Sequence, residues 1–184
     1  MAAARGAVTG NVLRRHIAGD MTGLAVFSSC ATYRYRLERA WDADAPALVF
    51  VMLNPSTADE QSLDATLRVC LRRARDGGFG SVRVLNLFAL RTRWPADLRS
   101  AYDPIGPGND AAIAGGLADL SGTADRVVCG WGNAGQLQGR GPEVERQLRA
   151  AGVALHHLGL TASGAPRHPL YVSLRQPLLP WREA

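Results

Sequence analysis

The stretch Ala47-Leu48-Val49-Phe50-Val51-Met52-Leu53-Asn54-Pro55 decides the fold of this chain. The residues from Ala47 to Leu53 are all apolar, and such a run is typical of a strand that is covered on both faces of a sheet. The pair Asn54-Pro55 then favours a turn. The sequence therefore predicts a central strand with a polar residue at its carboxyl end.

Strand and helix patterns alternate along the rest of the chain. Further strands are predicted at Ser81–Leu87, Arg126–Gly130 and Val153–Leu158, and helices at Ala65–Arg75, at about Asn109–Leu120 and at about Pro142–Ala150. Asp64 is in position to cap the first of these helices, and Gly77 and Gly78 are in position to end it. This order predicts an α/β fold, a three-layer sandwich around a mostly parallel central sheet of about four strands.

The residues before the central strand are predicted to add an N-terminal edge hairpin. Alternation in Tyr33-Arg34-Tyr35-Arg36-Leu37 is strand-like, with one apolar and one basic face, and Ala25–Ser28 is its partner. Residues 1–22 lack clear periodicity and are expected to be a loosely attached segment. No repeat or linker divides the remainder, so residues 23–184 are predicted to form a single α/β domain.

Composition and charge exclude several classes of function. The chain has 184 residues and a net charge of +5, and it contains Arg but no Lys. Lysine Schiff-base chemistry and a Walker-type phosphate loop are therefore excluded, whereas Arg suits phosphates and carboxylates. The cysteines form no C-x-x-C pair and the histidines lack metal-ligand spacing, so no metal and no cofactor are expected.

The sequence gives no sign of a membrane protein. No apolar run approaches the roughly 20 residues that span a bilayer. Charged residues such as Arg14, Arg15 and Asp20 interrupt any signal-like segment near the N-terminus. We therefore expect a cytoplasmic protein without a membrane partner, and its oligomeric state stays open.

Polar residues gather where the predicted strands end, which is where open α/β sheets bind their ligands. Asn54, Asn86 and Asn133 lie at or just after three of these ends. The candidate catalytic residues are Asn54, His168 and Asp64, and the candidate ligand contacts are Asn86, Ser56, Thr57, Arg91, Trp131, Asn133 and Arg167. An Asn amide can position water or bond both edges of a nucleobase, and a His can stabilise a developing anion.

Each candidate also has a structural interpretation. Asn54 before Pro55 is a favourable turn pair, Asn86 could satisfy buried backbone groups, and His168-Pro169 could close a loop. Asp64 could serve as a helix N-cap alone. Trp131 could be a core residue, and the arginines of the first helix could be a solvated face.

Three blocks of the sequence resemble the bacterial family known as domain of unknown function 1643. These blocks are 52–59 (Met-Leu-Asn-Pro-Ser-Thr-Ala-Asp), 86–91 (Asn-Leu-Phe-Ala-Leu-Arg) and 166–171 (Pro-Arg-His-Pro-Leu-Tyr). The likeness extends over roughly residues 27–171. The family has no assigned activity, so the resemblance implies a relationship and no reaction.

A weaker resemblance, to the uracil-DNA glycosylase superfamily, does imply a reaction and a fold of that type. Met52-Leu53-Asn54-Pro55-Ser56 is similar to its G-x-N-P-G motif, whose polar residue helps to position the hydrolytic water. Val84-Leu85-Asn86 is similar to a base-reading L-L-N segment, and His168-Pro169-Leu170 to the closing H-P-S motif. The motif glycines and the final Ser are missing here, which favours a nucleobase-sized pocket over duplex DNA.

These observations predict a metal-independent N-glycosidase-like hydrolase acting on a nucleobase in a nucleotide, nucleoside or nucleic acid. Asn54 would orient water or the sugar, Asn86 would read the base and His168 would stabilise the leaving base. Asp64 is a reserve candidate for the general base. The alternatives are a non-catalytic module that binds nucleic acid or nucleotide, and an enzyme of different chemistry in the same pocket, built from Asp64, Thr66 and His168.

Overall fold

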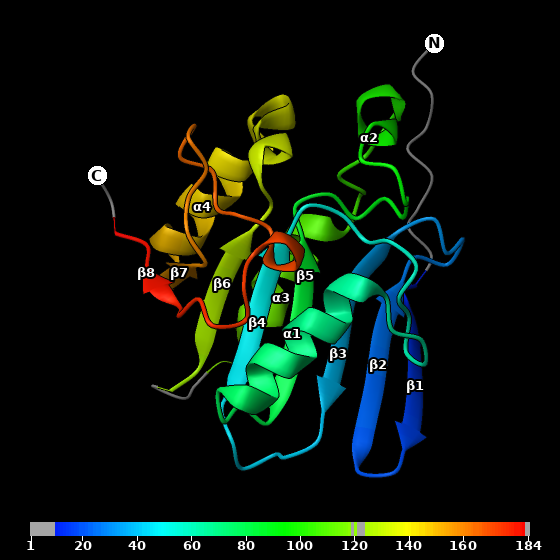
Figure 1. Cartoon of the computed structure of the whole chain (residues 1–184). Helices are drawn as coiled ribbons and strands as arrows, with labels where there is room; N and C mark the ends of the chain where they lie inside the picture. Colours follow the sequence, from blue (N-terminus) through cyan, green and yellow to red (C-terminus); the bar gives the residue numbers. More distant parts are fainter. Residues whose placement is uncertain (1–9, 119, 121–123, 183–184) are drawn as a thin grey trace.

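The computed structural model describes residues 10–118, 120 and 124–182, which build one eight-stranded mixed sheet with helices packed against it (Figure 1). The strands are β1 (Val12–Ala18), β2 (Met21–Phe27), β3 (Arg34–Ala40), β4 (Ala47–Met52), β5 (Ser81–Asn86), β6 (Arg126–Gly130), β7 (Leu155–His157) and β8 (Leu179–Pro180). The helices are α1 (Ala65–Asp76), α2 (Asp97–Ser100), α3 (Asn109–Ala118) and α4 (Arg140–Ala150). Two 3-10 helices cover Asn133–Gly139 and Pro169–Tyr171.

The predicted fold, a mostly parallel sheet of about four strands of the uracil-DNA-glycosylase type, is wrong. The strand order is β1-β2-β3-β5-β4-β6-β7-β8, and most neighbouring pairs among the described strands are antiparallel. β3 pairs directly with β5, so the N-terminal strands continue the sheet and do not form a separate edge hairpin. The sequence of β1 does not alternate between apolar and polar residues, because all seven of its residues are exposed, and the strand was therefore not predicted.

The segment expected to be loosely attached contributes a strand. β1 pairs antiparallel with β2, from Val12 opposite Phe27 to Ala18 opposite Met21. The predicted boundary between residues 22 and 23 therefore falls inside β2. Residues 1–9 lie outside the described residues.

Parallel pairing joins β5, β4, β6 and β7, and it brings their carboxyl ends to one edge of the sheet. Figure 1 shows α1 across the near face of these strands and α3 and α4 behind them. Alternate residues of β4 therefore enter two cores: Phe50 packs with residues of α1, and Val51 packs with residues of α3 and α4. This burial on both faces accounts for the continuous apolar run of β4.

Capping residues define the two ends of α1. The Asp64 carboxylate accepts a hydrogen bond from the backbone N–H of Leu67 at 2.8 Å, and Gly77 follows the last turn. The predicted helix and its N-cap are confirmed. The amino end of α1, where the helix dipole is positive, lines the same cavity as Asn54, which lies in the loop after β4.

A β-bulge in β3 changes which side chains face α1. Phe27 pairs with Arg34 whereas Val26 pairs with Arg36, so Tyr35 is an additional residue on β3. An extra residue reverses the alternation of faces. Arg34 is therefore separated from Arg36 and is buried, with 4% of its surface exposed, so the prediction that it belongs to a basic face is wrong.

Candidate functional site

A cleft of about 590 Å³ lies at the edge where the parallel strands end. Its walls come from the loops after β4, β5 and β6, from the first turn of α1 and from the segment around residues 161–171. The lining residues that carry the arguments below are Asn54, Ser56, Asp64, Trp131, Asn133 and His168. A volume of this size is typical of sites for small-molecule ligands, which range from about 300 to 1,000 Å³.

A smaller chamber of about 40 Å³ adjoins the cleft on the side of the sheet. Arg34, Met52 and Asn86 line the chamber but not the cleft. Five residues line both spaces, namely Asn54, Ser56, Asp64, Thr66 and His168. Since a buried water needs about 10–15 Å³, the chamber has room for a small group.

The structure brings most of the predicted site residues together. The residues at the cleft are Asn54, Ser56, Asp64, Trp131, Asn133, Arg167 and His168, and Asn86 lies in the chamber. Thr57 and Arg91 instead line a neighbouring depression of about 360 Å³ that shares Ser56 with the cleft. Arg91 donates to the carbonyl of Ala31 at 3.1 Å, and its guanidinium carbon lies 4.8 Å from the centre of the Phe27 ring.

Asn54 uses its amide nitrogen to hold two loops together. The Nδ2 atom donates to the carbonyl of Pro55 at 3.0 Å and to the carbonyl of Thr92 at 2.9 Å. These bonds link the loop after β4 to the loop after β5 and fix the orientation of the amide. The oxygen Oδ1 is then the atom with which Asn54 can accept a hydrogen bond from a ligand or a water.

Asp64 caps helix α1 and also lines both the cleft and the chamber. The oxygen Oδ1 accepts from Leu67, and a carboxylate has a second oxygen with lone pairs of its own. The negative charge of Asp64 acts on both His168 and Arg34. Asp64 is therefore the carboxylate that could accept a proton where the two spaces meet.

His168 has a defined tautomer. Its Nδ1 accepts a hydrogen bond from the backbone N–H of Leu170 at 3.3 Å, so the proton of the neutral ring is on Nε2. Burial lowers the pKa of His168 from its ordinary value, and the charge of Asp64 opposes this shift in part. Near neutral pH the side chain is therefore an uncharged imidazole that can donate through Nε2–H.

The loop after β6 forms one wall of the cleft and is held in place by hydrogen bonds. The Oδ1 atom of Asn133 accepts from the hydroxyls of Thr161 and Ser163, at 2.7 and 2.8 Å. Trp131 is 4% exposed and packs on Trp181, with 5.7 Å between the ring centres. Trp131 thus serves the core as well as the cleft, and Arg167 is an exposed residue at the rim.

This loop also has the glycine spacing G-x-G-x-x-G, from Gly130 to Gly135, which the sequence-based site did not include. The structure gives these glycines a packing role. A side chain on Gly135 would overlap the ring of Trp131, and one on Gly130 would press on Pro169. A 3-10 helix, Asn133–Gly139, follows the loop, so the α-helix that binds pyrophosphate in dinucleotide folds does not begin here.

Arg34 is the site residue that the sequence did not reveal. Its Nη1 donates to the carbonyl of Ala58 at 2.7 Å, and its Nη2 donates to Oδ1 of Asn86 at 3.3 Å. Within the described part of the chain, the Nε of Arg34 and the Nδ2 of Asn86 have no hydrogen-bond partner. Burial lowers the pKa of Arg34 to about 10, so the guanidinium remains charged at neutral pH.

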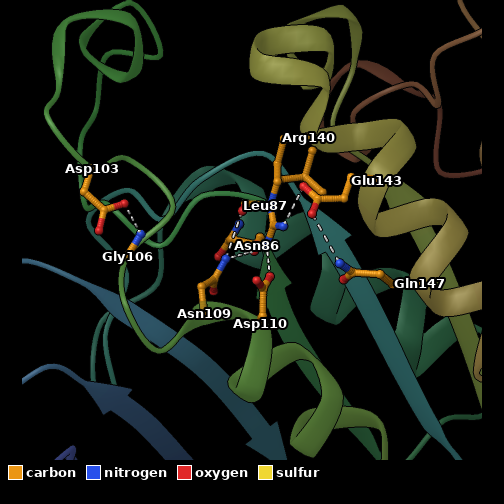
Figure 2. Close-up of polar contacts among 9 residues, drawn as sticks. All are labelled: Asn86, Leu87, Asp103, Gly106, Asn109, Asp110, Arg140, Glu143 and Gln147. Atoms are coloured by element: carbon orange, nitrogen blue, oxygen red, sulfur yellow. Dashed lines mark hydrogen bonds and ion pairs between the residues drawn. The ribbon is translucent and has the colours of Figure 1, made fainter. Parts of the chain in front are cut away.

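A second polar network fixes Asn86 from the other face of the sheet (Figure 2). The Nδ2 of Asn109, a fully buried residue, donates to the backbone carbonyls of Asn86 and Leu87 at 3.0 and 2.9 Å. The Nε of Arg140 donates to the same Leu87 carbonyl at 3.0 Å. Arg140 also forms ion pairs with Asp110 and Glu143. The end of β5 is therefore held by buried side chains.

The described residues include no group of three or more His, Cys, Asp or Glu side chains that could hold a metal ion. Each helix in this part of the chain is also too short or too polar to cross a lipid bilayer.

Fold and site together define an α/β protein with a mixed sheet and a ligand-sized cleft at the carboxyl edge of its parallel strands. The chain belongs to the family described as protein of unknown function DUF1643, whose model matches residues 34–170. The family resemblance seen in the sequence is thereby confirmed. No curated protein and no solved structure matches the chain.

Proposed function

We propose that the protein is a metal-independent N-glycosidase-like hydrolase that acts on a nucleobase in a nucleotide, nucleoside or nucleic acid. The observation that carries this proposal is that Asn54, Asp64 and His168 all lie at the junction of the cleft and the chamber. They supply an oriented amide oxygen, a carboxylate and a neutral imidazole N–H, which are the groups that such a hydrolysis requires.

In the proposed reaction the cleft holds the sugar and its base. Asp64 accepts a proton from water, and the water oxygen, oriented by Oδ1 of Asn54, bonds to the anomeric carbon. The bond between this carbon and the base nitrogen breaks, and the base leaves with the electron pair. His168 donates a hydrogen bond from Nε2–H as negative charge develops on the base, which takes up a proton on release.

Motifs support the same assignment. The segments 52–56, 84–86 and 168–170 resemble motifs of the uracil-DNA glycosylase superfamily, and they supply Asn54, Asn86 and His168 to the two adjoining spaces. The roles of these residues in base release are part of the proposal.

The proposal is tested by incubating the protein with nucleosides, nucleotides and DNA that contains uracil or hypoxanthine, followed by chromatography for free base. The variant D64N removes the proton acceptor but keeps a good N-cap residue. We expect D64N to lower the rate of base release by about 100-fold or more. The matched control is D76N, at the exposed carboxyl end of the same helix. Folded wild-type protein that releases no base from this panel would overturn the proposal.

A non-catalytic module that binds nucleic acid or nucleotide is the second candidate. Two exposed arginines, Arg93 and Arg167, line the cleft, and Asp64 already has a structural role as the cap of α1. Binding that weakens steeply with salt, without turnover, would favour this candidate.

A further inference from the structure

Among the described residues, four arginines have more than nine-tenths of their surface buried, and they differ in how their charge is compensated. Arg39 donates to three backbone carbonyls, Arg73 to four, and Arg140 to a carbonyl and two carboxylates. Within the part of the chain that the structure describes, Arg34 donates to one carbonyl and to one amide oxygen. A guanidinium has five N–H donors, and a buried charge is costly unless it is paired.

The described residues give Arg34 no ion-pair partner, although the charges of Asp64 and Asp59 act on it. Arg34 itself lines the chamber. A cation that is buried beside an adjoining cavity and incompletely paired favours an anionic occupant of that cavity.

Asn86 adds a second donor to the same chamber. Since its Oδ1 accepts from Arg34, the amide is oriented and its Nδ2 is the group left for a ligand. The side chain is 2% exposed, and the Asn109 network fixes its backbone. The atoms of the pair that lack a partner among the described residues are therefore N–H donors, and the matching group is an acceptor.

The volume of the chamber limits what this acceptor group can be. About 40 Å³ corresponds to a few water-sized positions, which suits a carboxylate or an exocyclic oxygen but not an entire nucleobase. The rest of the ligand would then occupy the cleft, which five shared residues join to the chamber.

We infer that Arg34 and Asn86 form a subsite for a planar, acceptor-only oxygen group that carries full or developing negative charge. The identity of this group rests on the proposed function: in base release it is a carbonyl oxygen of the departing base, on which charge develops as the bond to the sugar breaks. A carboxylate of a ligand offers the same chemistry. In the reaction Arg34 would stabilise the leaving base, and Asn86 would read an acceptor rather than both edges of the base.

Formate and uracil are the probes for this subsite, with sodium chloride at equal ionic strength as the reference and adenine, which has no carbonyl oxygen, as the control base. Binding is measured from the shift of the melting temperature over a concentration series. We expect R34Q to weaken the apparent Kd for formate by about tenfold or more, since it removes a charged donor. The control R36Q changes a partly exposed, ion-paired arginine on the same strand and should bind as the wild type does.

A second variant keeps the test decisive if R34Q fails to fold. N86D places a carboxylate within reach of Arg34 and supplies the counter-charge from within the chain. We expect N86D to raise the melting temperature without ligand and to abolish the shift with formate. Unchanged formate binding in either folded variant would overturn the inference, as would wild-type protein that binds neither probe.

The two probes also separate the sources of the oxygen group. A shift with formate and uracil but not adenine supports a base carbonyl, and a shift with formate alone supports a ligand carboxylate. Arg34-dependent formate binding without any base release would leave the subsite standing and overturn the hydrolase. If R34Q released base at the wild-type rate, the subsite would be overturned and the hydrolase would stand.

Discussion

Two buried arginines lie on opposite faces of the sheet, and both contact the end of β5. Arg140 bonds to the Leu87 carbonyl and to the carboxylates of Asp110 and Glu143 (Figure 2). Among the residues that the structure describes, Arg34 bonds to the Asn86 side chain and to a single carbonyl, and its Nε has no partner. Their side chains are similarly inaccessible, at 1% and 4% exposure, so burial alone does not distinguish them.

The difference lies in what compensates the charge. A buried guanidinium whose N–H groups are well paired stabilises the groups around it, whereas a buried charge that lacks partners has a desolvation cost that its removal recovers. Arg140 thus contributes to the fold, and Arg34 is maintained at some cost in stability for a ligand. Stability measurements on variants of residues from both faces test this difference.

The largest effect is expected for R140M. The variant loses the bond to the buried Leu87 carbonyl and two charge-assisted bonds to carboxylates that stay hydrated, so we expect the free energy of unfolding to fall by about 3 kcal/mol. Urea denaturation followed by circular dichroism measures it, with R36Q as the control on a partly exposed ion pair. A loss for R140M no greater than for R34M would contradict the contrast.

A smaller loss is expected for N109A on the same face. The change leaves the buried carbonyls of Asn86 and Leu87 without the amide that bonds both, which should cost about 2 kcal/mol. Because Asn86 would be less firmly held, formate binding should weaken as well. If N109A lowered stability but left formate binding intact, the network would support the fold without positioning the subsite.

R34M should change stability least of the three variants. The desolvation cost that is recovered by removing a buried, unpaired charge offsets the two bonds lost to Ala58 and Asn86, so we expect the free energy of unfolding to change by no more than about 1 kcal/mol, at the expense of ligand binding. The same urea titrations, made without and with formate, measure both quantities. A loss of about 3 kcal/mol without ligand would show that Arg34 is a structural residue like Arg140.

The sequence predicted those features whose cause lies within a few neighbouring residues. The helix α1 with its caps Asp64 and Gly77 was predictable, because capping depends on residues within one turn. Asn54 and Asn86 were predictable as strand-end residues because each follows or ends an apolar run. Arg34 was not, because a bulge in β3 turns it toward α1, and a bulge depends on the register with a neighbouring strand. The sheet was mispredicted for a related reason, since exposed β1 has no apolar periodicity.

The smallest predicted effect concerns pH and His168, which lies in the chamber with Arg34 and Asp64. Burial lowers the pKa of His168 below its ordinary value of 6.5, so the unfolded chain binds more protons between the two values. The contribution of neutral His168 to stability is therefore complete above pH 6.5 and is lost as the pH falls through the folded pKa. Denaturation curves measured from about one pH unit above the ordinary pKa of 6.5 to about one and a half units below it give this slope.

The variant H168N isolates the contribution of His168, because Asn is a good N-cap and can still accept from Leu170 but does not titrate in this range. We expect the loss of stability below pH 6.5 to be smaller in H168N than in the wild type. Some loss should persist, because burial also lowers the pKa values of His156 and His157. An identical pH slope in H168N and the wild type would show that the charge of Asp64 offsets the burial of His168. The imidazole would then not be held neutral beside Arg34.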